Sequence, residues 1–117
     1  MIFTPLGECA VGHTEAYNVY GVVIDSTAPY YKCKPTVCVR LIDPTLNMEC
    51  AQSNGDRAQT FATLQLFANE RGKLPHVLHV GDIMRFNKVN VSLYRDMKQF
   101  VCNVWSKSSW TIFRGYR

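Results

Sequence analysis

Aromatic and basic side chains recur on one phase of several predicted strands. Phe67, Tyr94 and Trp105 are the aromatics, and Arg40 and Lys88 share their phase. Aromatic rings stack on nucleobases, and cations neutralise the phosphate of each linkage. The pattern therefore favours binding of single-stranded nucleic acid. The alternative, that Phe67 and Trp105 are covered by a loop or the tail and only pack, stays open on the residues alone.

Asp43 is an acidic residue at the end of one of these strands. Its carboxylate could accept hydrogen bonds from the N1 and N2 donors of a guanine. It also precedes Pro44, where an Asp side chain commonly caps a turn. The sequence leaves these two roles equally open.

The sequence gives little support for a metal site or for nucleophilic catalysis. Cys33 and Cys38 with His76 and His79 would make a Cys₂His₂ set, but their spacings do not fit a zinc knuckle. No histidine neighbours a cysteine or serine in a catalytic motif, and there is no glycine-rich phosphate loop. We expect no metal, no cofactor and no enzymatic activity.

The composition indicates one domain with a real core. The chain has 117 residues, of which 47% are hydrophobic and 19% charged. No apolar run approaches the roughly 18 residues of a membrane-spanning helix, so no membrane association is expected. Residues 81–117 hold seven of the 13 Lys and Arg but two of the nine acids, which favours a polyanion as partner.

Five cysteines are an odd number, and none has the CxxC spacing. A disulfide framework would normally be even and denser. Cys38 and Cys102 fall within apolar strand patterns, where a thiol serves as a small core residue. The cysteines therefore indicate a reducing compartment, either cytosol or nucleus.

The stretch 81–105 predicts a long hairpin, because apolar residues alternate with polar ones on both sides of a polar turn at 94–98. The alternation slips by one residue between Phe86 and Val89. Such a slip predicts a β-bulge that bends the strand around the corner of a barrel.

Three further strands are expected at 17–25, 36–43 and 61–67, with a loop at 26–35. A short helix should lie between the third and fourth strands, starting near Pro75. Gly21 marks a bend or a close backbone approach. Trp110 and Phe113 in the basic tail are expected to close one end of the core. The inward residues should be Val37, Val39, Leu41, Ala62, Leu64, Leu66, Val89, Val91, Leu93, Phe100, Cys102 and Val104.

This order of elements predicts an all-β fold, a five-stranded oligonucleotide/oligosaccharide-binding (OB) barrel. Residues 1–16 would form a lead-in and residues 17–117 the single domain. Another small closed or half-open barrel is the alternative.

Several segments, in order and at suitable spacing, make the chain resemble a known family from about Tyr17 to Phe113. The family is that of the first OB domain of the ciliate telomere end-binding protein alpha subunit, related to the protection-of-telomeres proteins. The segments are Val22–Asp25, Leu41–Leu46, Ala62–Phe67, Leu74-Pro75, Gly81–Phe86, Ser92–Tyr94, Gln99-Phe100 and Ser108–Trp110.

The resemblance implies sequence-selective binding of single-stranded G-rich telomeric DNA without enzymatic activity, at the telomeres of chromosomes in the nucleus. A second OB domain or a partner telomere subunit would share the task. Where the family has an aromatic after the position of Trp105, this chain has Ser106. By matching positions, the resemblance implies a DNA-binding site formed by Arg40, Asp43, Phe67, Lys88, Tyr94, Arg95 and Trp105.

Two other functions fit the same pattern. The barrel could bind single-stranded DNA or RNA without sequence preference, or its aromatics could bind a peptide as part of a protein-interaction module. Competition between G-rich and random single strands distinguishes telomeric binding from binding without sequence preference. Loss of all nucleic-acid binding would leave the protein-interaction module.

Overall fold

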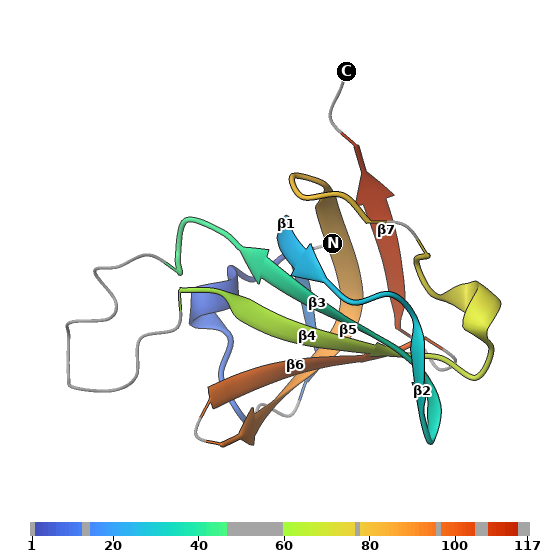
Figure 1. The fold of residues 1–117 in the computed structure, drawn as a ribbon. Coiled ribbons are helices and arrows are strands. Elements are labelled where there is room, and N and C mark those ends of the chain that lie inside the picture. The colour runs from blue at the N-terminus through green and yellow to red at the C-terminus, as the bar shows by residue number, and fades with distance from the viewer. Residues whose placement is uncertain are drawn as a thin grey trace.

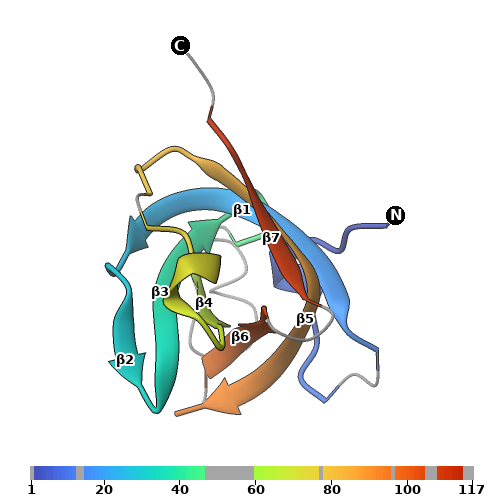
Figure 2. The same ribbon diagram turned by 90° about the vertical axis from the view of Figure 1, so that its right-hand side faces the viewer.

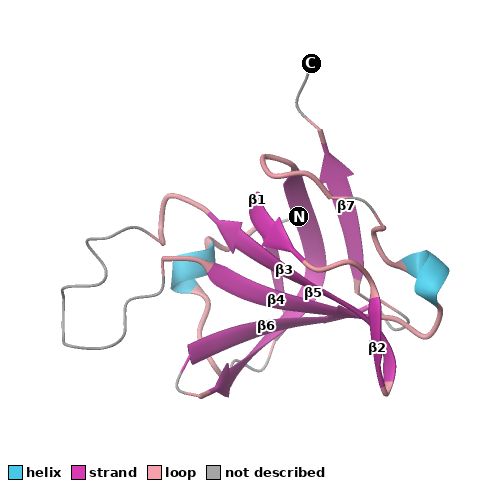
Figure 3. Ribbon diagram, in the orientation of Figure 1, coloured by secondary structure: helices cyan, strands magenta, loops and turns pink. Residues whose placement is uncertain are grey.

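The computed structural model describes residues 2–12, 15–46, 60–76, 78–95, 97–104 and 108–114. Regular structure in these ranges is almost entirely β-strand, as Figure 3 shows. The elements are η1 (Leu6–Glu8), β1 (Tyr17–Ser26), β2 (Tyr30–Lys32), β3 (Lys34–Ile42), β4 (Ala62–Phe67), η3 (Arg71–Lys73), β5 (Ile83–Tyr94), β6 (Met97–Asn103) and β7 (Ser109–Phe113).

Five of these strands close into a barrel. The order around the sheet is β1-β3-β4-β6-β5, and β5 pairs again with β1 (Figure 2). β4 and β6 are parallel, whereas the neighbouring pairs β1–β3, β3–β4, β5–β6 and β1–β5 are antiparallel. This connectivity confirms the predicted OB barrel.

Alternate side chains of the barrel strands fill the core, as predicted. Val37, Val39 and Leu41 of β3 are fully buried. The predicted inward residues of β4 are likewise buried, as are Phe100 and Cys102 of β6. Val91 and Val104 are partly buried and pack against this core.

Leu93 is the exception, because its side chain is 61% exposed. From Asn90 onward β5 pairs only with β6, so the end of this hairpin projects beyond the strand that covers the rest of β5. The strands also run further than expected, to Tyr94 and from Met97, which leaves a shorter turn than the predicted 94–98.

The predicted bulge in β5 is present. Tyr17 of β1 pairs with Val89 and Val19 pairs with Phe86, so β5 holds one extra residue between these two pairs. Lys88 takes the left-handed conformation there, with φ of 63°. Both of its backbone groups are satisfied, because its N–H donates to Asn18 Oδ1 at 3.1 Å and its carbonyl accepts from Ser108 Oγ at 2.7 Å.

Two short strands were not predicted. β2 lies inside the expected loop 26–35 and pairs with the start of β3 around Cys33, whose φ is 66°. All three residues of β2 are exposed, so no apolar alternation marks it. β7 lies in the expected tail and pairs with β5, extending the sheet beside the barrel (Figure 1).

A short helix lies between β4 and β5, as predicted, but it does not start near Pro75. η3 is a single 3₁₀ turn that ends at Lys73, before Pro75. Trp110 packs against the core and donates from Nε1 to the Lys73 carbonyl at 2.9 Å, so it helps to close this end of the barrel. Phe113 does not, because it is exposed.

The N-terminal residues contribute to the core. Leu6 and Cys9 are buried, and burial raises the pKa of the Cys9 thiol to about 11. Burial likewise raises the pKa of Cys102 to about 12, so both thiols are protonated at neutral pH and act as small core groups. Cys38 faces outward and is half-buried.

Gly21 is the site of a close approach, as its position in β1 predicts. A Cβ added there would lie 3.1 Å from the Ile42 carbonyl oxygen, Leu41 Cβ and Leu6 Cδ1. Gly21→Ala should lower the free energy of unfolding by about 1–3 kcal/mol, because backbone and packed core must shift. Gly72→Ala is the control, since no atom lies within 4 Å of its added Cβ. Urea unfolding measures both, and equal midpoints would contradict the tight contact.

Candidate nucleic-acid interface

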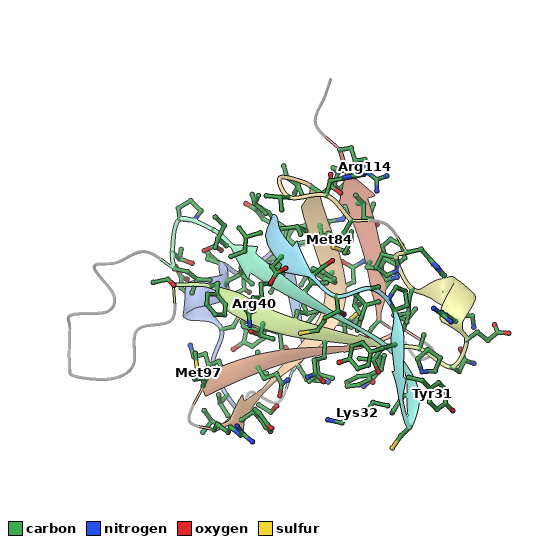
Figure 4. All side chains as sticks on the ribbon, in the orientation of Figure 1. Tyr31, Lys32, Arg40, Met84, Met97 and Arg114 are labelled. Carbon is green, nitrogen blue, oxygen red and sulfur yellow. The ribbon has the colours of Figure 1, made fainter. Side chains whose placement is uncertain are left out.

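An open pocket lies at one end of the outer face of β3, β4 and β6. Thr63 pairs with Arg40 on one side and with Gln99 on the other, so these three outward side chains form one row. Figure 4 shows Arg40 and Met97 at this end of the face. The pocket has a volume of about 280 Å³ and is lined by Arg40, Phe61, Thr63, Tyr94, Arg95, Met97, Lys98 and Gln99.

Arg40 stands between an aromatic ring and a carboxylate. Its Cζ lies 4.9 Å from the centre of the Phe61 ring, and its Nη1 lies 3.7 Å from Asp25 Oδ2. The Arg40 and Asp25 side chains are 51% and 63% exposed, so this ion pair contributes little. A phosphate could therefore replace Asp25 beside Arg40 at small cost.

Tyr94 and Arg95 form the wall of the pocket at the tip of the β5–β6 hairpin. The Tyr94 side chain is 57% exposed, and Arg95 Cζ lies 5.3 Å from the centre of its ring. Arg95 has a φ of 52°, which fits a tight turn between the two strands. The hairpin thus presents a ring and a cation side by side.

Phe67 lies at the other end of the same face. It follows Thr63 by four strand residues, about 13 Å at 3.3 Å per residue. Lys34 Nζ lies 5.1 Å from the centre of its ring. Tyr31 and Lys32 of the adjoining β2–β3 hairpin are exposed at this end (Figure 4). Both ends of the face therefore combine aromatic rings with cations.

Asp43 has a structural role in the conformation described. Its Oδ1 accepts from the Thr45 N–H at 2.9 Å and from Thr45 Oγ1 at 2.5 Å. Its Oδ2 accepts from the Leu6 N–H at 2.8 Å. The carboxylate thus caps the turn after β3 and holds the N-terminal segment against it, whereas the guanine contact stays a prediction.

Lys88, another predicted site residue, is not brought to the pocket. Lys88 lies at the bulge, next to Asn18 of β1 and Ser108, in the half of β5 away from Tyr94. Trp105 falls outside the described residues. DNA contacts by Lys88 and Trp105 stay predictions.

Five pocket residues lie outside the predicted site, namely Phe61, Thr63, Met97, Lys98 and Gln99, of which Phe61 is the aromatic one. It has the outward phase of Thr63 and Phe67, two and six residues later, and it precedes β4 directly. That phase, with Arg40 expected on the neighbouring strand, was the signal that could have found it.

Two expected absences can be compared with the described residues. Within them, no three His, Cys, Asp or Glu side chains are grouped so that they could hold a metal ion. Over the same ranges, no helix has the length and apolar character needed to cross a membrane.

The connectivity and the outer face define the chain as an OB-fold barrel. A family model described as "Telomeric single stranded DNA binding POT1/CDC13" matches residues 1–117. The chain is 35% identical to the telomere-binding protein subunit alpha of Stylonychia mytilus and 33% identical to that of Sterkiella nova. The chain belongs to the POT1/CDC13 family of telomeric single-stranded-DNA-binding proteins.

Both alignments cover 95% of this chain and 23% of the relative, so the chain spans about a quarter of these relatives. Solved structures agree on the fold. A Pot1–ssDNA complex superposes with a TM-score of 0.68 at 22% identity over 91% of this chain and 58% of that one. Fission yeast Pot1 with ssDNA gives 0.70 at 22% identity, over 95% of this chain and 35% of that one.

The hydrogen bonds of Asp43 predict a stability effect. Asp43→Asn should lower the free energy of unfolding by about 1–2 kcal/mol, because an amide nitrogen cannot accept from the Leu6 N–H. The control Asp25→Asn removes only an exposed ion pair and should change stability by under about 0.5 kcal/mol. Thermal unfolding measures both. Undiminished stability with weaker binding of G-rich DNA would assign Asp43 to the guanine contact instead.

Proposed function

We propose that this chain binds single-stranded G-rich telomeric DNA on the outer face of β3, β4 and β6, and that it acts at chromosome ends in the nucleus without enzymatic activity. The observation that carries the proposal is the pocket in which Arg40, Phe61, Tyr94 and Arg95 converge. Family membership supports it, since the relatives are named telomere-binding proteins.

The pocket offers each kind of contact that a single strand needs. The exposed ring of Tyr94 provides a stacking surface for a base, and Phe61 provides a second ring. Arg40 and Arg95 would neutralise the flanking phosphates. Thr63 supplies a hydroxyl and the neighbouring Gln99 supplies an amide. Both groups can hydrogen-bond the exposed edge of a stacked guanine.

The strand would continue along the face towards Phe67 and Lys34. Gln65 lies between Cys38 and Val101 in the middle of this path. Trp105 and Lys88 remain proposed further contacts. The DNA strand would then contact two sites of aromatic and basic residues, with a polar stretch of the protein face between them.

A partner domain would strengthen binding. Two or three stacked bases supply roughly 1–3 kcal/mol each. Association costs an estimated 4–15 kcal/mol, which offsets much of this gain. A second OB domain or a partner telomere subunit that holds the same strand would raise the effective concentration of the second contact and thus the affinity.

Alanine substitution of Tyr94 tests the site. Tyr94→Ala should weaken binding of a G-rich single strand by about 1–3 kcal/mol and leave the fold intact. Tyr20→Ala is a matched control, because Tyr20 is a similarly exposed tyrosine, at 53%, on β1. Fluorescence anisotropy measures binding, with a random single strand and the G-rich duplex as competitors. Equal losses in the two variants, or equal competition by duplex, would contradict the proposal.

The salt dependence of binding tests the cations. Arg40→Ala should flatten the slope of log K against log salt by about 0.7, the value for one phosphate contact on a single strand. Lys88→Ala, measured in the same way, decides whether DNA reaches the β5 bulge. An unchanged slope for Arg40→Ala would remove Arg40 from the interface.

A further inference from the structure

A second outer surface lies on β1, β5 and β7. Tyr20 of β1 pairs with Arg85 of β5, which pairs with Thr111 of β7, so these side chains share one row. Figure 2 shows β1 and β6 on opposite sides of the barrel, so this surface is separate from the proposed DNA site. We call it the β1–β5–β7 face; its members are Phe3, Tyr20, Ile83, Arg85, Asn87, Thr111 and Phe113.

Arg85 lies at the centre of this face between two aromatic rings. Its Cζ is 5.3 Å from the centre of the Phe113 ring and 5.9 Å from that of Phe3. Phe3 in turn meets Tyr20 edge-on, with ring centres 5.6 Å apart. The guanidinium is thus flanked by two rings, whereas that of Arg40 lies between one ring and the Asp25 carboxylate.

This guanidinium has no anionic partner among the described residues. Its Nε is buried without a hydrogen-bond partner, and Asn87 Oδ1, two residues along the same strand, is also unsatisfied. The nearby carboxylate of Asp82 pairs with Arg114 at 3.4 Å. A buried donor and a buried acceptor without partners are rare in folded proteins and costly. Arg85 as a whole is only half-buried, so an acceptor from outside could pair with its guanidinium.

The surroundings of Arg85 favour a protein as that partner. Tyr20, Ile83 and Phe113 are all exposed, and aromatic rings with arginine are typical of interface centres. Nucleic acid fits less well, because Ile83 offers no π surface and the rings of Phe3 and Phe113 already pack on Arg85.

The edge of β7 supplies the backbone groups for such a contact. β7 pairs with β5 on one side, and within the described residues no strand pairs with its other side. Figure 1 shows β7 at the margin of the sheet. An extended segment can add to an open edge of this kind and place alternate side chains on the neighbouring face.

We propose that the β1–β5–β7 face binds an extended acidic segment of a separate partner protein. The segment adds to the edge of β7, its apolar side chains cover Ile83 and Phe113, and one of its carboxylates pairs with Arg85. A second copy of this chain fits poorly, because it brings another unpaired guanidinium and another net charge of +4. This surface goes beyond the proposed DNA binding and does not depend on it.

An NMR titration of the 117-residue chain tests the proposal. The probe is a capped peptide of alternating valine and aspartate, about nine residues long to match a long strand. A peptide of alternating valine and lysine is the charge-reversed control. We expect the acidic peptide alone to shift the amide signals of Ser109–Phe113, with no shifts at Thr63 or Gln99.

Arg85→Gln should weaken this binding at least about tenfold, because it removes the charge that the carboxylate meets. Lys73→Gln is the control, an exposed cation in η3 that pairs with Glu70. If Arg85→Gln does not fold, Phe113→Ser replaces it and should also weaken binding, since Phe113 is exposed and its loss leaves Arg85 in place.

Four results would overturn the proposal. The acidic peptide could leave the β7 signals unchanged, or the lysine peptide could shift them equally. Arg85→Gln could instead weaken binding of G-rich single strands, which would make this face a nucleic-acid contact. Sedimentation could show a dimer that Arg85→Gln abolishes, which would make it an interface between copies of this chain.

Discussion

The barrel closes because β5 bends at the bulge centred on Lys88. The first half of β5 pairs with β1 and β7, and the second half pairs with β6. A left-handed conformation is unfavourable for lysine. The Lys88 N–H donates to Asn18 Oδ1 and its carbonyl accepts from Ser108 Oγ, so segments on both sides of β5 fix the bend. Without the extra residue, β5 would have to pair with β1, β6 and β7 as one straight strand.

The pocket is a consequence of this bend. Because β5 leaves β1 after the bulge, the tip of the β5–β6 hairpin projects beyond the barrel and carries Tyr94 and Arg95 with it. The register of β3 and β4 then decides what they meet. Arg40 pairs with Thr63, and a slip of one residue would turn Thr63 and Phe61 into the core. The site thus depends on pairings among four strands, whereas each of its side chains is exposed or only half-buried.

The sequence revealed those features that repeat along one strand. Alternation identified the buried residues of β3 and β4, and its slip after Phe86 identified the bulge. Features that depend on neighbouring strands were harder to predict. Leu93 has a perfect core phase, but no third strand covers the hairpin there. All three residues of β2 are exposed, so β2 has no alternation of buried and exposed residues that the sequence could reveal. For Asp43 the turn was visible, but its bond to Leu6, 37 residues away, was not.

Both outer faces combine an arginine with aromatic rings, but the two arginines differ in their exposure to solvent. Arg40 is half-exposed beside a ring, so a phosphate could approach it without desolvating a buried group, and the proposed contact would gain largely from released counterions. The Nε of Arg85 is already out of water and gains from any acceptor that reaches it. An anion that pairs with Arg85 must lose its own water first, whether it is a carboxylate or a phosphate. Arg40 is exposed and Arg85 half-buried, so the proposed nucleic-acid contact and the proposed protein contact differ mainly in how much water must be displaced.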